Sequence, residues 1–239
     1  MTTTPASLLA TDEVERLRTL RYYDILHSLH EQIFDEFVHL AARIFSLPIS
    51  LIALVDEDQV EYKANHGMPG MRAQPRVEAL CSVAIQQNKA VVVKDVAAEI
   101  QLPITDEARQ AAHRNNLRFY AGAPLRMPDQ RTIGTLCVID RNPRSFSAEE
   151  QHVLDQLAGL VAQTIAVRHF CLVTTELGED CWKDNQRRLI EEVHALVALV
   201  RYVNTRYGAQ VPVSHDVLTP VSRRMNDLRE ILQNYSQQS

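Results

Sequence analysis

Four cysteines are the residues of this sequence best suited to covalent chemistry. A thiolate can reduce a sulfoxide, bind a metal ion or carry a thioether-linked group. None of the four stands in a C-x-x-C pattern, and their spacing matches neither a zinc site nor a disulfide framework. We therefore predict buried, reduced thiols and no metal site. The four are Cys81, Cys137, Cys171 and Cys181.

A second chemical candidate is His215, within the segment Ser-His-Asp-Val-Leu-Thr-Pro-Val at residues 214–221. This segment resembles the phosphoacceptor box of sensor histidine kinases, Ser-His-Asp/Glu-Leu-Arg-Thr-Pro-Leu, which presents a histidine on a dimeric helix. Val217 and Leu218 replace the family's Leu and Arg, and Pro212 interrupts the helix upstream. Only 18 residues follow, too few for a full second helix, and we find no ATP-binding domain. His215 is therefore interpreted as a structural position or as a phosphoacceptor for a separate kinase.

Other polar groups indicate less specific chemistry. His66, Arg72 and His113 could together meet an anionic ligand over a sheet, although single histidines are more often surface or core residues. The run Asp-Glu-Asp at residues 56–58 has too few oxygen ligands at loop spacing for a calcium site. We predict a turn there.

Composition excludes several classes of protein. The chain has 239 residues, 46% of them hydrophobic and 23% charged, as in ordinary globular proteins. A net charge of −5 gives no basic surface for nucleic acid. We see no apolar run near the ~20 residues of a membrane helix and no signal peptide at the N-terminus. We therefore expect a cytoplasmic protein that binds neither nucleic acid nor membrane.

The elements that position these residues follow from the hydrophobic pattern. Helices are predicted at 12–22 with Asp12 as N-cap, 33–46, 77–88, 104–115, 148–170, 182–207 and from about 214 or 219 to 235. Strands are predicted at 49–55, 60–65, 90–94, 119–125 and 132–139. Helices before, between and after a mostly antiparallel sheet predict an α+β fold with helices covering the sheet.

The stretch from Arg118 to Glu150 is the most informative. Its two apolar segments predict an antiparallel hairpin, in which Gly122 and Gly134 indicate close approach of another group. We expect Pro124 to interrupt regular pairing, because it cannot donate a ladder hydrogen bond. The following Ser-Ala-Glu-Glu at residues 147–150 predicts a capping box and the start of a long helix.

Three regions are predicted along the chain: an N-terminal tail and lead-in helix at 1–30, a sensor-type domain at 31–170, and an α-helical extension at 171–239. The extension carries one apolar stripe at helical spacing. Intramolecular packing and a dimer seam both explain such a stripe. Its residues are Leu189, Val193, Leu196, Val200 and Val203.

Residues 34–168 resemble a GAF domain, of the kind common in bacterial sensor proteins beside histidine kinases and diguanylate cyclases. Four segments carry the resemblance: 47–56 (LPISLIALVD), 80–85 (LCSVAI), 119–125 (FYAGAPL) and 134–140 (GTLCVID) followed by Pro143-Arg144. The resemblance implies an antiparallel GAF/PAS-like sheet covered by helices. It does not imply one ligand, since the family hosts cyclic nucleotides, bilins, haem and other small molecules.

Residue by residue, the resemblance disfavours specific activities. Ile139-Asp140 stands where cyclic-nucleotide members have Asn-Lys, which disfavours cyclic-nucleotide binding. Residues 104–116 lack the cysteine to which bilin members attach their pigment, so a covalent bilin is disfavoured. The cofactor is unknown. Cys81 falls where free methionine sulfoxide reductases, a third branch, have a cysteine. We find no resolving cysteine at the other expected positions, so that enzyme is a minor alternative.

We therefore expect a non-enzymatic sensory or regulatory protein that binds a small molecule or acts as a signalling interaction module. It would form a homodimer, transmit through its flanking helices, and act on a sensor kinase, a diguanylate cyclase or another signalling partner. Candidate ligand-binding residues are Tyr62, Cys81, Asp95, Phe119, Tyr120 and Cys137.

Overall fold

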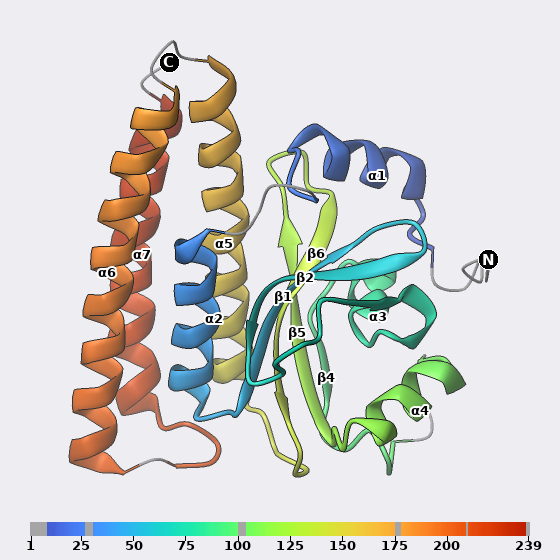
Figure 1. Cartoon of the computed structure of the whole chain (residues 1–239). Coiled ribbons are helices and arrows are strands. Elements are labelled where there is room, and N and C mark those ends of the chain that lie inside the picture. Colours follow the sequence, from blue (N-terminus) through green and yellow to red (C-terminus); the bar gives the residue numbers. More distant parts are fainter. Residues whose placement is uncertain (1–8, 27–30, 100–103, 175–177, 209, 238–239) are drawn as a thin grey trace.

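A six-stranded antiparallel sheet separates two groups of helices in the computed structural model (Figure 1). The structure describes residues 9–26, 31–99, 104–174, 178–208 and 210–237. The strand order is β3-β2-β1-β6-β5-β4. The predicted α+β fold is confirmed. The strands are β1 (Ile49–Val55), β2 (Gln59–His66), β3 (Ala73–Pro75), β4 (Val91–Val93), β5 (Phe119–Arg126) and β6 (Thr132–Asp140).

Each face of the sheet has its own apolar core. On one face, α2 (Gln32–Phe45) and α5 (Ala148–Thr174) pack against the strands. On the other face lie α3 (Cys81–Gln87) and α4 (Asp106–Arg114), which follow the short 3₁₀ helix η2 (Arg76–Glu78). The lead-in helix α1 (Glu13–Tyr22) crosses one end of the sheet (Figure 1).

The β5–β6 hairpin forms as predicted, with its irregularity displaced. β5 and β6 pair from Phe119 to Leu125 without interruption, and the register shifts only between Leu125 and Arg126. β4 begins opposite Gly122, so β5 has no described strand partner on that side at Pro124, and a proline is tolerated. The expected loss of pairing at Pro124 therefore holds on the β4 side, whereas the pairing with β6 continues through it. A Cβ on Gly134 would lie 2.1 Å from the Ala53 carbonyl oxygen, which confirms the close approach of another strand.

The capping box of α5 is confirmed. The Glu150 backbone N–H donates to Ser147 Oγ at 3.1 Å, and the Ser147 N–H donates to Glu150 Oε2 at 2.7 Å. Asp12, by contrast, makes no side-chain cap on α1, because its carboxylate pairs with Arg131 at 3.4 Å. Glu13 accepts the Ala10 backbone N–H instead, at 3.1 Å.

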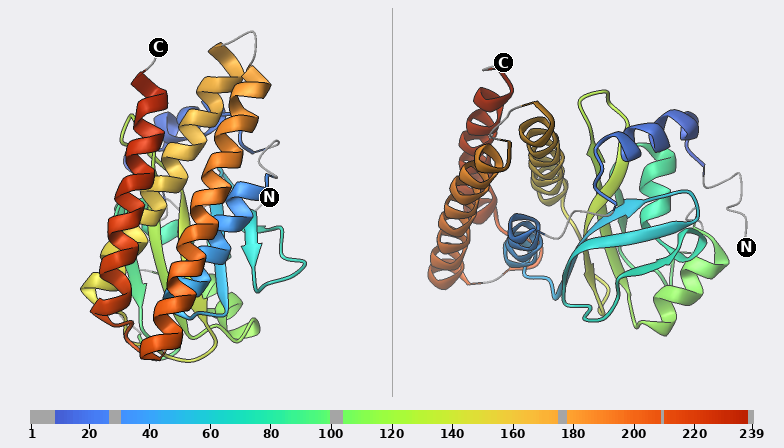
Figure 2. Two further views of the ribbon diagram at one scale, coloured as in Figure 1. Left: turned by 90° about the vertical axis from the view of Figure 1, so that its left-hand side faces the viewer. Right: turned by 45° about the horizontal axis from the view of Figure 1, so that its top comes forward.

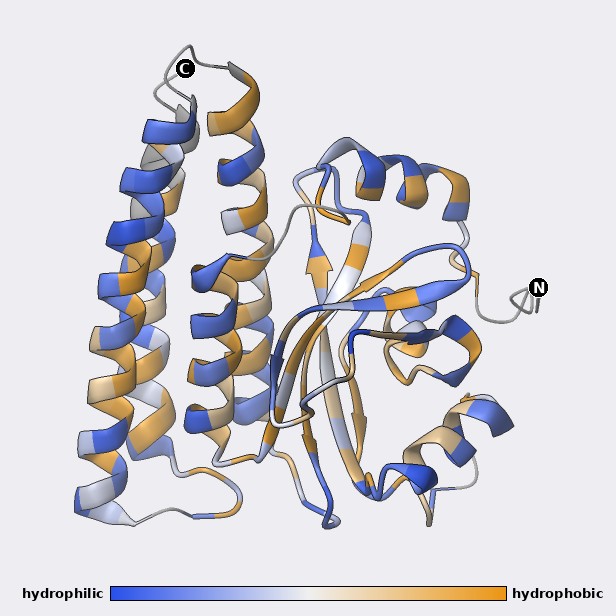
Figure 3. Ribbon diagram, viewed as in Figure 1, coloured by the Kyte–Doolittle hydropathy of each residue, from blue (hydrophilic) through white to orange (hydrophobic). Residues whose placement is uncertain are grey.

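The C-terminal extension packs on the same chain. Helices α6 (Gly178–Tyr207) and α7 (His215–Gln237) lie against α2 and α5, so four helices form a bundle on one face of the sheet (Figures 1 and 2). The predicted apolar stripe of α6 faces this bundle interior and is buried (Figure 3). Its role is therefore intramolecular.

Two carboxylates, the partly buried Glu31 and the fully buried Glu150, tie the extension to the rest of the fold. Glu31, just before α2, accepts hydrogen bonds from Trp182 Nε1 at 2.5 Å and Gln186 Nε2 at 3.0 Å on α6. Glu150, at the start of α5, accepts from the Val213 backbone N–H at 3.0 Å, just before α7. The α6–α7 hairpin is thus held near both of its ends.

Helix α5 is long and apolar, contrary to the expectation that no apolar run approaches the length of a membrane helix. Residues Ala148–Val173 are long and apolar enough, by length and composition, to cross a membrane, and 56% of their most apolar window is buried inside the fold. The helix lies between the sheet and α6 and α7, so its apolar residues fill the protein core on several sides (Figure 2).

Candidate functional site

A small, partly enclosed cavity lies on the sheet face opposite the helical bundle. Its volume is about 30 Å³, which is the space of roughly one water molecule. The β2–β3 connection, η2 and α4 form its outer wall. The lining residues are Leu51, Tyr62, Met68, Met71, Gln74, Glu78, Leu80, Cys81, Ala108, Ala111, Ala112, Asn115, Leu117, Tyr120 and Ile139.

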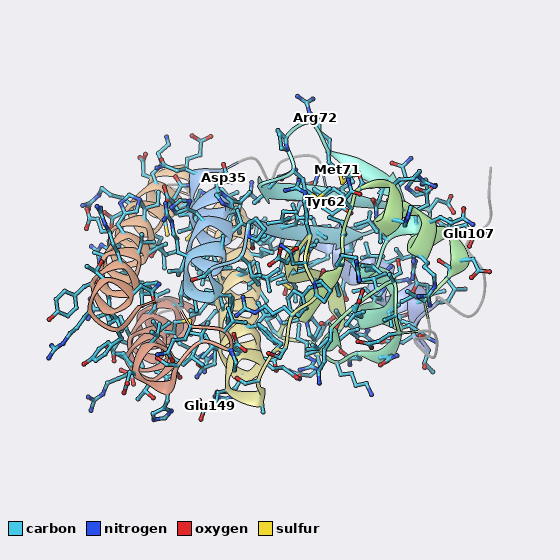
Figure 4. The ribbon with its side chains drawn as sticks, turned by 90° about the horizontal axis from the view of Figure 1, so that it is seen from below. Asp35, Tyr62, Met71, Arg72, Glu107 and Glu149 are labelled. Carbon is cyan, nitrogen blue, oxygen red and sulfur yellow. The ribbon has the colours of Figure 1, made fainter. Side chains whose placement is uncertain are left out.

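Three of the predicted ligand-binding residues line this cavity: Tyr62 from β2, Cys81 from the start of α3, and Tyr120 from β5. Figure 4 shows Tyr62 close to Met71 of the outer wall. A fourth, Cys137 on β6, is fully buried beside them in the same apolar core. Residues distant in the sequence thus meet at one place.

The other two predicted residues lie elsewhere. Phe119 precedes Tyr120 on the same strand, so its side chain points to the opposite sheet face, where its ring centroid lies 5.5 Å from that of Phe146. Asp95 is outside the cavity lining, and its carboxylate accepts two hydrogen bonds from the Arg118 guanidinium, at 2.6 and 2.8 Å. Neither can contact a ligand in this cavity.

Cys81 and Cys137 are neighbouring thiols in the buried core, and Cys137 Sγ donates to the Leu51 carbonyl oxygen at 3.7 Å. The interaction with the Cys137 thiol lowers the pKa of Cys81 to about 7, although burial opposes this. The same interaction and burial raise the pKa of Cys137 well above its usual range. Burial, reinforced by the charge on the two sulfurs, raises the pKa of Tyr62 and of Tyr120. Near neutral pH, therefore, the Cys81–Cys137 pair carries at most one negative charge.

Two buried hydroxyls surround the thiol pair without partners of their own. Tyr120 Oη and Thr135 Oγ1 make no hydrogen bond with the residues that the structure describes. Both lie close enough to Cys81 to help lower its pKa, so they can donate once Cys81 is a thiolate. An unpaired buried hydroxyl costs about 1–3 kcal/mol. The site therefore holds unused hydrogen-bonding capacity.

Strand and helix geometry explain how these groups fit together. A Cβ on Gly122 would lie 2.2 Å from Tyr120 Oη, so this glycine lets the Tyr120 ring lie along its own strand. Ala108, Ala111 and Ala112 recur on one face of α4 and present only methyl groups to the cavity. The helical spacing of these alanines is the sequence signal for the α4 wall.

A charged network connects the cavity wall to α1. Arg76 on η2 is fully buried, and its carbonyl oxygen accepts the Ser82 hydroxyl at the start of α3, at 2.7 Å. Its guanidinium pairs with Glu13 at 2.6 Å, and Glu13 also pairs with the buried Arg16 at 2.6 Å. Burial raises the pKa of Glu13, but the two guanidinium groups outweigh this and lower it to about 2.

The anion-binding trio considered from the sequence does not form. Arg72 is exposed and points away from the molecule (Figure 4), and His113 is exposed on α4. His66 is half-buried against His39 of α2, at 5.3 Å between ring centroids, and burial lowers its pKa. Among the described residues no group of three or more His, Cys, Asp or Glu side chains could hold a metal ion.

His215 lies on the helical bundle, on the other side of the sheet from the cavity (Figure 1). It is the first residue of α7, and its side chain is 73% exposed. Thr219 Oγ1 is 3.0 Å from Nε2, and Glu149 Oε1 is 3.5 Å from Nδ1. An open groove of about 530 Å³ runs beside it between the first turns of α5 and α7.

Parts of this chain are similar in sequence to known proteins. A family model described as "GAF domain" matches residues 28–166. A cyclic di-GMP phosphodiesterase of Pseudomonas aeruginosa is 31% identical over 183 residues, covering 76% of this chain and 30% of the relative. A diguanylate cyclase of Escherichia coli is 28% identical over 104 residues, covering 39% of this chain and 30% of the relative.

Among solved structures, the GAF domain of an Acinetobacter phosphoenolpyruvate-protein phosphotransferase matches with a TM-score of 0.48 and 20% identity. The match covers 67% of this chain and 97% of that one. The chain thus spans 30% of the length of each curated relative named above.

Proposed function

This chain belongs to the GAF domain family of signalling modules, and we propose that it senses a small molecule without catalysing a reaction. The ligand would occupy the cavity beside Tyr62, Cys81 and Tyr120. The observation that carries the proposal is the pair of unpartnered hydroxyls, Tyr120 Oη and Thr135 Oγ1, buried near a cavity with alanines on its outer wall. A ligand would supply the missing hydrogen bonds.

A ligand larger than water requires the outer wall to move, because the cavity holds only about 30 Å³. The charged network would transmit this movement from the cavity wall to α1. The wall includes η2 and α3, and Arg76 of η2 pairs with Glu13 of α1. Binding would shift α1 only if the ligand has different affinities for the open and closed wall.

A screen with a matched pair of variants tests the sensor function. Native mass spectrometry and thermal-shift screening of the full chain should find a stabilising small molecule. Tyr120→Phe should unfold at the same temperature or higher without ligand, since it removes an unpaired buried hydroxyl, yet lose most of the ligand-induced shift. Ala112→Leu should also abolish that shift by filling the cavity. A ligand shift that survives in both variants would place the ligand elsewhere.

A second candidate function is thiol-based reduction of free methionine sulfoxide. The observation in its favour is the position of Cys137, which the fold brings next to Cys81 although it lies far away in the sequence. Cys81 would take the oxygen of the sulfoxide as a sulfenic acid, and Cys137 would then form the disulfide and release water. Reductant-coupled turnover that is lost in Cys81→Ser and Cys137→Ser supports this enzyme; no turnover in the wild type removes it.

A third candidate function is phosphoacceptance at His215. The exposed imidazole at the start of α7 is accessible to a separate kinase, and Thr219 lies within hydrogen-bonding distance of it. Incubation with a candidate kinase and ATP should label the wild type and leave His215→Gln unlabelled. Equal labelling of both would exclude this residue.

Location, assembly and partners belong to the same proposal. We propose that the module is cytoplasmic and forms a homodimer. Its signalling partner would be a sensor kinase, a diguanylate cyclase or a cyclic di-GMP phosphodiesterase, since the two curated relatives are named as enzymes of the last two kinds. Light scattering at micromolar concentration tests the dimer. A partner cyclase or phosphodiesterase should change its rate when this chain is added, and an unchanged rate excludes that partner.

A further inference from the structure

The second pair of cysteines lies at the corner where α5 meets α6. Cys171 is in the last turn of α5 and Cys181 in the first turn of α6, and their Sγ atoms are 2.7 Å apart. No disulfide bond joins the two sulfurs in this structure. A disulfide bond is about 2.05 Å long, so the two sulfurs need to approach by less than about 1 Å.

The surroundings of the two sulfurs differ. The Cys171 side chain is buried, whereas Cys181 is partly exposed and can be reached from solvent. Burial and the neighbouring Cys181 raise the pKa of Cys171 to about 12, so Cys171 keeps its proton. Cys181, whose sulfur solvent can reach, is therefore the thiol that meets an oxidant first.

A buried amide completes the site. Asn185, one turn after Cys181, is almost fully buried, and its Nδ2 lies 3.6 Å from each of the two sulfurs. Its Oδ1 has no hydrogen-bond partner within the part of the chain that the structure describes. The Nδ2 can donate to a thiolate and the Oδ1 can accept the proton of a thiol or sulfenic acid, so one side chain serves both states.

We propose that Cys171 and Cys181 are a redox modification site that hydroperoxides oxidise to an intramolecular disulfide. The Cys181 thiolate attacks the peroxide, which breaks the O–O bond, leaves a sulfenic acid on Cys181 and releases an alcohol or water after protonation. The Cys171 sulfur then attacks the Cys181 sulfur, and the hydroxyl group leaves with the Cys171 proton as water. Two thiols are oxidised and one peroxide is reduced.

The disulfide would fasten α6 to α5 at the corner where Glu31 already binds Trp182 and Gln186. Oxidation therefore holds the helical extension against the sensor domain. This site is separate from the ligand cavity, which lies on the opposite face of the sheet, so it does not depend on the proposed sensor function.

The test uses the full chain, hydrogen peroxide, and alkylation of the remaining thiols. The oxidised wild type should keep two alkylatable thiols, and peptide mapping should find Cys171 linked to Cys181. The melting temperature should rise by about 5 °C or more and return after reduction by dithiothreitol. A linkage of Cys81 to Cys137 alone, a disulfide between two chains, or an unchanged melting temperature would overturn the proposal.

Two variants check the order of the steps. In Cys171→Ser, Cys181 should accumulate as a sulfenic acid that dimedone traps. In Cys181→Ser, Cys171 should stay reduced at the same peroxide concentration, and its oxidation at the wild-type rate would refute the assignment of roles. The double variant Cys81→Ser/Cys137→Ser should still form the disulfide.

Discussion

Replacing Glu13 with glutamine tests the charged network that joins the cavity wall to α1. Arg16 and Arg76 are 1% and 0% exposed, and Glu13 pairs with both of them. The pKa of Glu13 falls from 4.5 to about 2 on folding, and a difference of that size corresponds to about 3 kcal/mol of stability. Because solvent reaches part of this carboxylate, we expect Glu13→Gln to cost about 2 to 3 kcal/mol at neutral pH.

The pH dependence gives the sharper measurement. The folded-state pKa of Glu13 lies below the unfolded value, so its contribution is complete above about pH 5 and is lost as the pH falls toward 2. The difference in unfolding free energy between wild type and Glu13→Gln should therefore shrink over that interval. Urea unfolding followed by circular dichroism and by the fluorescence of Trp182, the one tryptophan, measures this.

The matched control is Glu15→Gln on the same helix. Glu15 pairs with Arg18, and both side chains are exposed, so this change should cost less than about 0.5 kcal/mol. The reasoning is refuted if Glu13→Gln costs no more than the control. It is equally refuted if the wild-type and Glu13→Gln stabilities differ by a constant amount from about pH 5 to about pH 2.

Three further changes test the packing of the sheet and the extension. Gly134→Ala should lower the unfolding free energy by about 2 kcal/mol or more, because the new Cβ would meet the Ala53 carbonyl oxygen at 2.1 Å. The control is Gly159→Ala on α5, where the new Cβ would meet Arg229 Nη2 at 3.7 Å, an ordinary contact. This change should be neutral or stabilising by up to about 1 kcal/mol. Glu31→Ala should expose Trp182 and shift its fluorescence to longer wavelength, whereas an unshifted spectrum would show that Glu31 does not hold α6. Glu150→Ala should lower the unfolding free energy by about 3 to 5 kcal/mol, measured by chemical denaturation, because it leaves the buried Arg144 without its carboxylate partner. A loss below about 1 kcal/mol would contradict that account.

Local features of the fold were predictable because their causes lie within a few residues. The Ser147–Glu150 capping box, the β5–β6 hairpin and the apolar strand β1 each depend on neighbouring residue types, and all three form. Asp12 does precede the first residue of α1, as predicted, but its side chain does not cap the helix. Its carboxylate binds Arg131, which lies far away in the sequence, and that competing partner cannot be seen in a capping pattern.

The composition of the candidate site was only half predictable. Tyr62, Cys81, Tyr120 and Cys137 were named from the sequence and meet at the cavity, but Phe119 was named with them. Adjacent residues of a strand point to opposite faces, and a shift of one residue reverses the assignment. Only the pairing of β5 with β6 decides which of the two aromatic residues faces the cavity.

The sequence by itself determined the family, the α+β class and nearly every helix and strand, because hydrophobic periodicity and turn residues act over short distances. Tertiary structure alone decided which thiols are neighbours, since Cys81 and Cys137 meet only when α3 packs on β6. It also decided that the α6 stripe is covered by this chain and that two arginines are buried on one glutamate. Such contacts depend on how distant elements pack, and no short pattern records them.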